Sequence, residues 1–441
     1  MGIAETLEYI HNVKWQGSKP GLERTRELLA AIGNPQKSLK FVHIAGTNGK
    51  GSTAACVASI LRKAGYRTGL YTSPYVLKFN ERMQADGENI SDEELVRLTN
   101  EIRPFADVME DAPTEFEMIT ALAMNFFSYK NCAIVVLEAG MGGELDSTNI
   151  IDLPEVAVIT AIGYDHVKEL GPALTDIAAA KAGIIKGGDV LIYGSTPEVE
   201  AVFEKVCYER GATLHRADFE RITREEFSLD CTKLSITPYG EISIPLVGSY
   251  QPKNVLTAIS AIEILQRKGY KISDNDIISG LASVYWPGRF EILGLAPVFI
   301  LDGAHNPQGM EVTVDSLRRH FGEKKIHFII GVMADKDVDS MMSCIAPAAA
   351  AFFAVMPNNP RAMDTKTLGE KLSRFGAPVR AFDSIEKGVM EAVCSAGKDG
   401  IVCAAGSLYF SGDVRHAYAQ CTSTLQTSIA NKKHENILSV R

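Results

Sequence analysis

Phe41-Val-His-Ile-Ala-Gly-Thr-Asn-Gly-Lys-Gly-Ser-Thr53 is the stretch of this 441-residue chain that says most about its fold. The apolar run predicts a strand, the glycines a turn, and the segment from Ser52 onward a helix. Small residues in such a loop let backbone N–H groups close on an anion at the positive end of the helix. Lys50 can reach terminal phosphates, and Ser52 or Thr53 can present a hydroxyl to Mg²⁺. The stretch therefore predicts a nucleoside triphosphate site.

The loop departs in two places from the general phosphate-binding pattern G-x-x-x-x-G-K-[ST]. Ile44 stands where the first glycine belongs, and Gly51 separates Lys50 from Ser52. An ordinary glycine-rich turn between a strand and a helix is the alternative interpretation. The order of strand, loop and helix favours phosphate binding.

Length and composition are those of a globular protein with more than one domain. A chain of 441 residues exceeds what one hydrophobic core usually serves. Its 46% apolar and 22% charged residues are ordinary values. The net charge of −9 argues against a nucleic-acid surface, so no nucleic-acid partner is expected.

Cysteine usage and the absence of apolar segments predict the compartment. Eight cysteines are scattered without a C-x-x-C pair, which favours a reducing cytoplasm. The N-terminus has no basic start and no long apolar core, so no signal peptide is expected. The longest apolar run, Ile345 to Met356, contains Pro347 and is shorter than the ~20 residues that cross a bilayer. We expect a soluble cytoplasmic monomer with no membrane partner.

The first part of the chain alternates short apolar runs with helical stretches from Lys40 to about Ser195, which predicts a doubly wound α/β sheet. Strict alternation between about His215 and Val247 predicts a small antiparallel addition. The expected strands are 66–71, 133–137 and 156–160, and the expected helices are 52–64, 91 towards 102, 115–129, 254–268 and 274–283.

A second series of strands and helices follows Trp286-Pro-Gly-Arg289, the predicted domain junction. Its strand-like runs predict a smaller Rossmann-like sheet. The expected strands are 298–301, 326–330, 351–355, 379–382 and 401–405. The predicted domains are therefore residues 1–288, a Mg²⁺–nucleotide-binding P-loop domain, and residues 289–441, a Rossmann-like domain.

Polar residues follow four expected strands of the first domain, where ligands of open α/β sheets bind. They are the Lys50 loop, Thr72-Ser73-Pro74, Glu138 and Tyr164-Asp165-His166. An acid that ends an apolar strand beside a phosphate loop is an expected Mg²⁺ ligand. Taken singly, Glu138 is equally a surface acid and His166 a loop histidine. In this order they favour a joint metal–nucleotide site.

Other candidate residues carry less information by themselves. Lys181 lies on an expected helix among small residues, and the pattern alone predicts a solvated lysine there. In the second domain, Asp302 and His305 follow a strand, and Asp335-Lys-Asp337 follows the next one. Reactive groups at the facing strand ends of two domains predict a cleft that domain closure completes.

Eight motifs together resemble the folylpolyglutamate synthase/dihydrofolate synthase family, the folate branch of the Mur ligase superfamily. The resemblance runs in order from about Gly21 to Arg415. It rests on Gly46-Thr-Asn-Gly-Lys-Gly-Ser52, Thr72-Ser-Pro74, Phe79-Asn-Glu-Arg82, Pro113-Thr-Glu-Phe-Glu117, Leu145-Asp-Ser-Thr-Asn149, Lys181-Ala-Gly-Ile184, Asp302-Gly-Ala-His-Asn-Pro307 and Gly406-Ser-Leu-Tyr409.

The resemblance implies an ATP-dependent ligase that joins L-glutamate to a folate, or to dihydropteroate. A carboxylate is phosphorylated to an acyl phosphate, and the amine of glutamate then attacks it. Mg²⁺, as two ions, is the implied metal. The domains become a Mur ligase central-type domain and a glutamate-ligase C-terminal domain. Lys50 and Mg²⁺ would neutralise the charge that develops on the transferred phosphoryl group.

The resemblance also implies roles for single residues. Ser73 and Glu138 would hold one Mg²⁺, and Glu138 with His166 a second. Lys181 would be carbamylated and support the metal. The implied catalytic residues are Lys50, Lys181 and His305. The implied ATP-binding residues are Thr47, Asn48, Gly49, Lys50, Gly51, Ser52, Asn254, Arg289 and Asp302, and the implied folate-binding residues are Arg82, Asp146 and Asn149.

Four residues depart from the family pattern without touching the implied phosphate or metal ligands. Tyr75 and Tyr250 stand where histidine is common, Glu144 replaces a common arginine, and Ala180 replaces a common glutamate. Tyr75 and Glu144 leave the choice of pterin substrate open.

Two other functions compete with this one. A Mur-type ligase acting on another amino acid and carboxylate would share the same site. A P-loop switch without ligase activity is the alternative from a different class. A GTPase would need N-K-x-D, and the nearest string, Asn431-Lys-Lys-His434, lacks the aspartate. The second Rossmann-like domain favours a substrate cleft.

Overall fold

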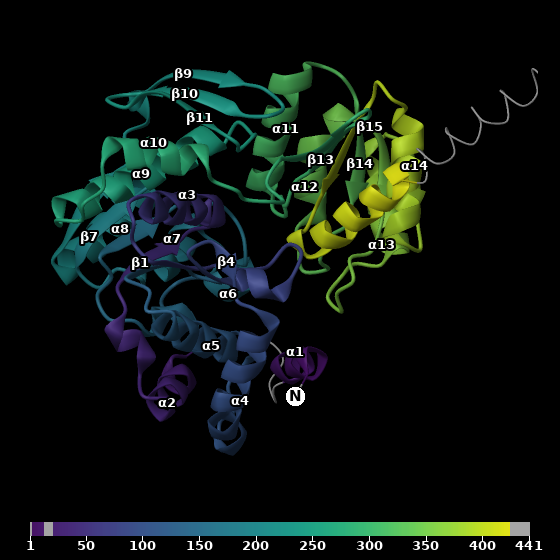
Figure 1. Cartoon of the computed structure of the whole chain (residues 1–441). Helices are drawn as coiled ribbons and strands as arrows, with labels where there is room; N and C mark the ends of the chain where they lie inside the picture. Colours follow the sequence, from purple (N-terminus) through teal and green to yellow (C-terminus); the bar gives the residue numbers. More distant parts are fainter. Residues whose placement is uncertain (1, 13–20, 424–441) are drawn as a thin grey trace, which may run out of the picture.

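The computed structural model describes residues 2–12 and 21–423. They form two units, each built on a mainly parallel sheet, with a small antiparallel sheet beside the first (Figure 1). The N-terminal unit carries an eight-stranded sheet and the C-terminal unit a six-stranded one. Within the described ranges, no helix has both the length and the apolar character needed to cross a membrane.

The eight-stranded sheet has the order β4-β3-β2-β5-β1-β6-β7-β8. The six strands β2, β5, β1, β6, β7 and β8 pair in parallel. Strands β3 and β4 add an antiparallel edge next to β2. The strands are β1 Phe41–Ala45, β2 Thr68–Tyr71, β3 Met83–Ala85, β4 Glu88–Asn89, β5 Ile134–Glu138, β6 Val156–Ile159, β7 Gly188–Ile192 and β8 Ala212–Arg216.

Helices cover both faces of this sheet. Alternate residues of β1 face opposite layers: Val42 and Ile44 pack with α3, α9 and α10, whereas Phe41 packs with α4 and α5. The helices are α1 Ile3–His11, α2 Glu23–Ala31, α3 Lys50–Lys63, α4 Asp92–Val108, α5 Glu115–Tyr129, α6 Val167–Leu170, α7 Leu174–Ala182, α8 Pro197–Arg210, α9 Gln251–Arg267 and α10 Asp274–Ala282.

The antiparallel sheet has the order β11-β10-β9 and covers the outer side of α9 and α10 (Figure 1). Its strands are β9 Ile222–Phe227, β10 Thr232–Ile236 and β11 Gly240–Ile244. Leu234 and Ile242 are fully buried with the helices, while neighbouring residues face solvent. This alternation of buried and exposed residues is the period of two that the sequence shows.

The six-stranded sheet has the order β12-β13-β17-β14-β15-β16, with only β12 antiparallel. One face packs on α11, α12 and α13 and the other on α14. The elements are β12 Glu291–Leu295, β13 Val298–Leu301, α11 Pro307–Phe321, β14 Ile326–Ile330, α12 Val338–Ile345, β15 Ala349–Ala354, α13 Thr365–Leu372, β16 Val379–Ala381, α14 Ile385–Ala396 and β17 Ile401–Ala405.

Short 3₁₀ turns join many of these elements. They are η1 Pro35–Ser38, η2 Phe79–Arg82, η3 Ser147–Ile150, η4 Phe219–Arg221, η5 Ala346–Ala348, η6 Ser373–Phe375 and η7 Leu408–Phe410.

The predicted fold class is confirmed. The predicted elements differ mainly at their ends, whereas the antiparallel strands β3, β4 and β12 were not predicted. Helix α3 begins at Lys50 rather than Ser52, because Gly49 adopts φ +88° and forms the N-cap. Helix α9 begins at Gln251 rather than Asn254, since Pro252 is tolerated in a first turn. The boundary between residues 288 and 289 stays a prediction.

Gly280 permits the close crossing of α10 over α3. A Cβ at Gly280 would lie 2.6 Å from the Cα of Ile60, and the Ser59 hydroxyl donates to the Gly280 carbonyl at 2.7 Å. Alanine normally stabilises a helix relative to glycine. At this position it would instead force two backbones apart.

We predict that Gly280→Ala lowers the free energy of unfolding by about 1–3 kcal/mol, the usual cost of overpacking a core. Gly369→Ala in α13 is the matched control, because its Cβ would meet only Ala381 Cβ at 3.7 Å. The control should be neutral or stabilising by up to ~1 kcal/mol. Urea unfolding of both variants measures the difference, and equal stabilities would contradict the packing argument.

Candidate active site

The phosphate loop joins β1 to α3, as the sequence predicts, and its glycines are enclosed by close neighbours. Three positions of the loop have no room for a side chain, so they must be glycine. An added Cβ would lie 1.9 Å from Thr160 Oγ1 at Gly46, 2.5 Å from Asn254 Oδ1 at Gly49 and 2.8 Å from Trp286 Cζ2 at Gly51. Asn254 therefore lies against the loop from α9, and it is 3% exposed.

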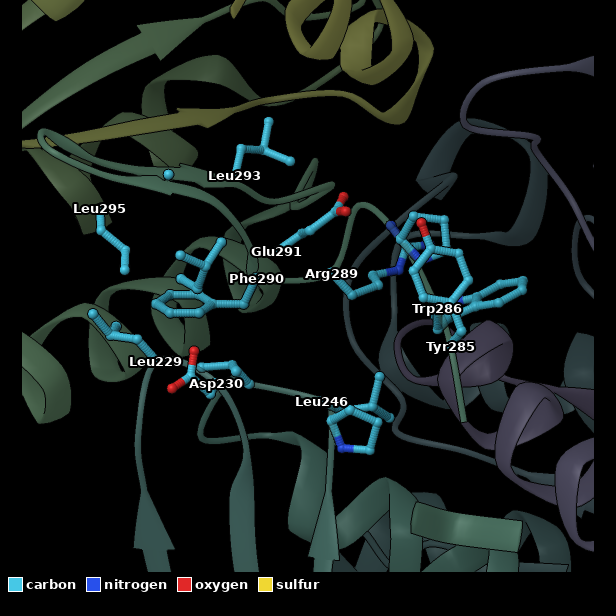
Figure 2. Close-up of a pocket in the computed structure, with 15 residues that line it drawn as sticks. Leu229, Asp230, Leu246, Tyr285, Trp286, Arg289, Phe290, Glu291, Leu293 and Leu295 are labelled. Carbon is cyan, nitrogen blue, oxygen red and sulfur yellow. The ribbon is translucent and has the colours of Figure 1, made fainter. Parts of the chain in front are cut away.

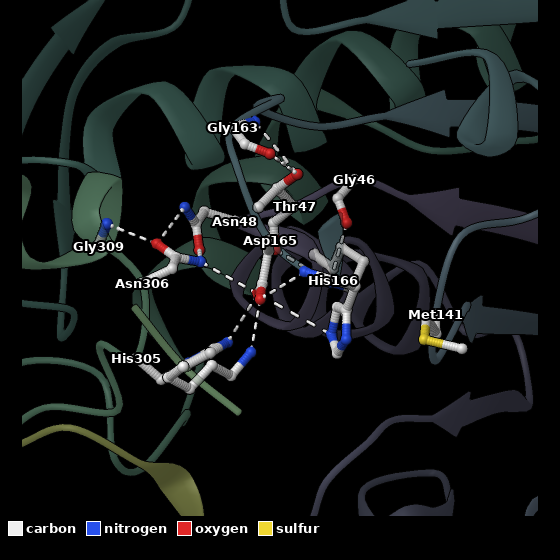
Figure 3. Close-up of polar contacts among 12 residues, drawn as sticks. Gly46, Thr47, Asn48, Met141, Gly163, Asp165, His166, His305, Asn306 and Gly309 are labelled. Carbon is white, nitrogen blue, oxygen red and sulfur yellow. Dashed lines mark hydrogen bonds and ion pairs between the residues drawn. The ribbon is translucent and has the colours of Figure 1, made fainter. Parts of the chain in front are cut away.

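The loop is also joined to the segment that follows β6. The Thr47 hydroxyl donates to the Gly163 carbonyl at 3.0 Å and accepts from the Gly163 amide at 3.1 Å (Figure 3). The amides of Thr47 and Asn48 both donate to the Ala161 carbonyl. These bonds fix the course of residues 46–48. Ser52 is buried in the first turn of α3.

Two lysines, Lys50 and Lys181, converge on one carbonyl of this loop. Lys50 Nζ donates to the carbonyls of Gly46 at 3.0 Å and Thr47 at 3.1 Å. Lys181 Nζ donates to the Gly46 carbonyl at 2.8 Å. Burial lowers the pKa of both lysines, and the charge of Lys50 lowers the pKa of Lys181 further.

Lys181 is the clearest correction to the sequence pattern. The pattern predicts a solvated lysine, but Lys181 is only 4% exposed. Burial and then the charge of Lys50 lower its pKa to about 7. The face of helix α7 that carries Lys181 packs towards the loop after β1 instead of facing solvent. The alanines beside Lys181 were the available signal, because small residues allow a helix to approach closely.

Glu138 ends β5 at the same edge of the sheet, and it is 3% exposed. The Ser73 amide donates to its Oε2 at 3.2 Å. Burial raises the pKa of Glu138, although the charges of Lys50 and Arg289 oppose the shift. A buried carboxylate of this kind gains free energy from a bound cation, so its chemistry suits a Mg²⁺ ligand.

Asp165 is the centre of a polar network that joins the two units (Figure 3). From the C-terminal unit, His305 Nε2 lies 3.3 Å from its carboxylate, Asn306 Nδ2 donates at 3.3 Å, and Lys336 forms a short ion pair. Its neighbour His166 has Nε2 at 3.9 Å. Asp165 and Lys336 each have nearly buried side chains, which are 7% and 12% exposed.

The ionisation of this network is set by its charges. Burial alone would raise the pKa of Asp165, but the hydrogen bond and charge of His305, with the charges of Lys336 and His166, hold it well below its usual range. Burial lowers the pKa of His166 to about 4. Its imidazole is therefore neutral at pH 7, as a metal-binding nitrogen must be.

Asp302 lies outside this network. Its Oδ2 accepts from the Tyr250 hydroxyl at 2.9 Å and the Phe290 amide at 2.8 Å, and its Oδ1 accepts from the Ala304 amide at 2.8 Å. The segment 283–290 between α10 and β12 is the inter-unit link. The Asp302 carboxylate therefore connects the start of α9, this link and the loop after β13. His305 Nδ1 lies 2.8 Å from the Gly303 carbonyl, which orients the ring towards Asp165.

The residues implied for folate binding are also hydrogen-bonded within the protein. Asp146 accepts from the Met141 amide at 2.9 Å and from the Thr148 amide at 3.0 Å. Asn149 Nδ2 donates to the carbonyls of Glu144 at 3.0 Å and Gly183 at 3.2 Å. Asp146 and Asn149 therefore shape the loop after β5.

Arg82, the third implied folate-binding residue, ends the short turn η2 before β3. Its guanidinium lies over the rings of Tyr75 and Phe79, at 5.3 and 5.7 Å from their centroids. Its Nε is buried without a hydrogen-bond partner. A buried donor of this kind is available to an acidic ligand.

A cavity of about 380 Å³ lies along the link between the units (Figure 2). Trp286 and Arg289 lie at one end of it, Leu229 and Phe290 lie at the other, and Leu246 lies between them. Phe290 has φ +49°, a strained conformation for a bulky residue. The Arg289 side chain extends from the link to the loop after β13. Its terminal nitrogen would lie 2.2 Å from a Cβ added at Gly303.

The structure brings most of the predicted residues together around the phosphate loop. Within residues 2–12 and 21–423, however, no group of three or more His, Cys, Asp or Glu side chains is placed to hold a metal ion. Sequence reasoning did not assign roles to Asp165, Asn306, Gln308 or Lys336. Their positions beside predicted strand ends were the only signal.

A phosphate loop facing a second Rossmann-like unit defines a ligase of the Mur class. Residues 44–262 match the Mur ligase middle domain, and residues 288–408 match the Mur ligase glutamate ligase domain. A Bacillus subtilis dihydrofolate synthase/folylpolyglutamate synthase is 36% identical over 93% of this chain and 98% of its own length. An Escherichia coli dihydrofolate synthase/folylpolyglutamate synthase is 31% identical over 92% and 93%. The chain belongs to the folylpolyglutamate synthase/dihydrofolate synthase family.

Solved structures agree over nearly the whole chain. A Mycobacterium tuberculosis folylpolyglutamate synthase complexed with ADP has a TM-score of 0.88 at 29% identity, covering 94% of this chain and 98% of that one. Escherichia coli FolC in complex with DHPP and ADP has a TM-score of 0.84 at 29% identity, covering 95% and 98%.

We predict that Asp165→Asn lowers the free energy of unfolding by about 3 kcal/mol at pH 7, because it leaves Lys336 buried without its counter-charge. The low folded-state pKa of Asp165 stabilises the protein above its unfolded value of about 4, and this stabilisation is lost as the pH falls below it. The difference from wild type should therefore shrink under acid. Urea unfolding at several pH values measures it.

Asp335→Asn is the matched control for this prediction, since Asp335 is exposed on the same loop as Lys336. The control should remain within about 0.5 kcal/mol of wild type. If Asp165→Asn were as stable as this control, the network would not hold the units together.

Proposed function

We propose that this protein uses ATP to ligate L-glutamate to a folate, and also to dihydropteroate, through an acyl-phosphate intermediate. The observation that carries the proposal is the junction of the units. Asn48 of the phosphate loop exchanges hydrogen bonds with Asn306 of the C-terminal unit, at 3.2 and 3.1 Å. ATP at this loop would be enclosed by both units, as an intermediate sensitive to water requires.

The reaction runs in two displacement steps. A carboxylate oxygen of the acceptor attacks the γ-phosphorus of ATP, and the bond to ADP breaks. The glutamate amine then attacks the acyl carbon, loses a proton, and phosphate leaves. Lys50 carries the charge suited to the transferred phosphoryl group, and Asn254, Arg289 and the residues from Thr47 to Ser52 surround the nucleotide. His305 and Asp302 come from the C-terminal unit.

Mg²⁺ is the proposed metal, as two ions. Ser73 and Glu138 would hold one of them, and Glu138 with His166 the other. The buried carboxylate of Glu138 and the neutral imidazole of His166 suit such a cation. When bound, Mg²⁺ would neutralise phosphate charge during phosphoryl transfer. Substrate and phosphate oxygens would complete its coordination.

The acceptor is proposed to lie near Arg82 and the loop that Asp146 and Asn149 shape. Tyr75 belongs to this end, because its ring lies beside the Arg82 guanidinium. We further propose a cytoplasmic monomer whose partners are small molecules, with no nucleic-acid or membrane partner. The eight cysteines are all free, as a reducing compartment requires.

We predict that wild-type protein releases ADP with ATP, glutamate and either tetrahydrofolate or dihydropteroate as acceptor. Lys50→Ala and Glu138→Gln should each lower the rate by about 10²–10³, because each removes charge needed for phosphoryl transfer. Coupled measurement of ADP release gives the rates, and melting curves confirm that the variants are folded.

Lys63→Ala is the control, since Lys63 is exposed at the far end of the same helix. It should turn over like wild type. Acceptor-independent ADP release by wild type would overturn the proposed function. Near-normal turnover by folded Lys50→Ala or Glu138→Gln would overturn the placement of the site.

Lys181 is proposed to carry a carbamate. Its amine has a pKa of about 7, so a large fraction is neutral and nucleophilic at physiological pH. Addition of CO₂ forms an N–C bond and releases one proton, which converts the group to an anion. That anion would lie beside Lys50, and it would replace a repulsion between two buried cations with an attraction.

We predict that Lys181 takes up ¹³CO₂ as a carbamate, observed by NMR, with uptake rising as the pH passes through about 7. An ordinary lysine would require a pH near 10. Lys181→Ala should lose both the signal and the ligase activity. Exposed Lys168 supplies the control variant, Lys168→Ala, which should keep both. An unchanged ¹³C signal in Lys181→Ala would contradict the assignment.

A further inference from the structure

Gln308, the second residue of α11, reaches from the C-terminal unit to the phosphate loop. Its Oε1 accepts a hydrogen bond from Asn48 Nδ2 at 2.6 Å, and its Nε2 donates to the Ile162 carbonyl at 3.2 Å. One amide thus bonds both to the loop after β1 and to the segment after β6. The family resemblance and the motifs quoted for it assign no role to Gln308.

The space for this side chain depends on Gly163. A Cβ at Gly163 would lie 2.5 Å from Gln308 Oε1 and 2.9 Å from its amide carbon. Gly163 has no left-handed φ, so its backbone accepts any residue. The three atoms nearest to that Cβ all belong to Gln308, so an alanine at this position would act first on the Gln308 side chain.

Among residues 2–12 and 21–423, the Asn48 side chain hydrogen-bonds to the C-terminal unit through Asn306 and Gln308 alone. Asn306 is itself fixed, because its Oδ1 accepts from the Gly309 amide at 2.8 Å and caps α11. Gln308 therefore adds a further, shorter hydrogen bond to Asn48. The first turn of α11 is held directly against the phosphate loop.

We propose that Gln308 is a positioning residue that acts through Asn48 and couples the shape of the phosphate loop to the docking of the C-terminal unit. The inference deepens the proposed function, on which it rests for the identity of the nucleotide. Gln308 does not touch reacting atoms. It sets how well the loop is ordered to receive phosphate groups.

The experiment measures ADP affinity by calorimetry, because ADP binding needs neither acceptor nor glutamate. Gln308→Leu removes both hydrogen bonds at similar size, and Gly163→Ala displaces the intact side chain. Glu311→Ala, exposed on the same helix, is the control. The Kd for ADP, the KM for ATP, kcat and Tm are measured for each.

We predict that Gln308→Leu and Gly163→Ala each weaken ADP binding and raise the KM for ATP by about tenfold, because each removes the hydrogen bond to Asn48 and a tenfold loss lies within the range of one neutral hydrogen bond. Their Tm values should stay close to that of Glu311→Ala. In an Asn48→Ala background, Gln308→Leu should cost less than twofold further, since its route to the loop is already gone.

Two outcomes would overturn the inference. One is a folded Gln308→Leu with wild-type ADP affinity and KM for ATP. The other is a full tenfold loss from Gln308→Leu in the Asn48→Ala background, which would exclude action through Asn48. Failure of the proposed function gives a different result: wild type would bind ADP and show the same variant effects, but release no ADP in response to either acceptor.

Discussion

The close packing around the phosphate loop is the constraint on which the rest of this structure depends. Gly46, Gly49 and Gly51 each face a neighbour that leaves no room for a side chain. Those neighbours come from three separate places: Thr160 directly follows β6, Asn254 belongs to α9 and Trp286 belongs to the inter-unit link. The loop thereby fixes the sheet, a covering helix and the link relative to one another, before any ligand is considered.

Charge burial is the second organising feature. Lys181 and Glu138 are buried at one edge of the eight-stranded sheet, and the partly buried Lys50 lies beside them. Burial shifts the pKa of each towards its neutral form, which is unfavourable for an isolated protein. The nucleotide phosphates and the cations proposed for this site would restore the balance of charge. Asp165 differs, because the C-terminal unit supplies its counter-charges within the protein.

Much of the fold was predictable from local patterns. The strand–loop–helix order around Lys50 and the uninterrupted apolar run before Glu138 are properties of short segments, and both occur as expected. The alanines beside Lys181 allow close packing of its helix, but they occur on several faces, so they do not show which face is buried. The network at Asp165 was hidden for another reason. It depends on His305 and Lys336, which only the tertiary fold brings near.

The Asp165 network is divided between two units, and this division limits how the protein can be truncated or rearranged by engineering. A chain ending at the link would retain the whole phosphate loop, yet it would keep the carboxylate of Asp165 without His305, Asn306 and Lys336. The C-terminal unit alone would lack the Asp165 carboxylate that these three side chains contact. We therefore expect neither unit to function alone. A circular permutation or gene fusion must keep both units in one chain and must let them dock with the Asp165 contacts intact.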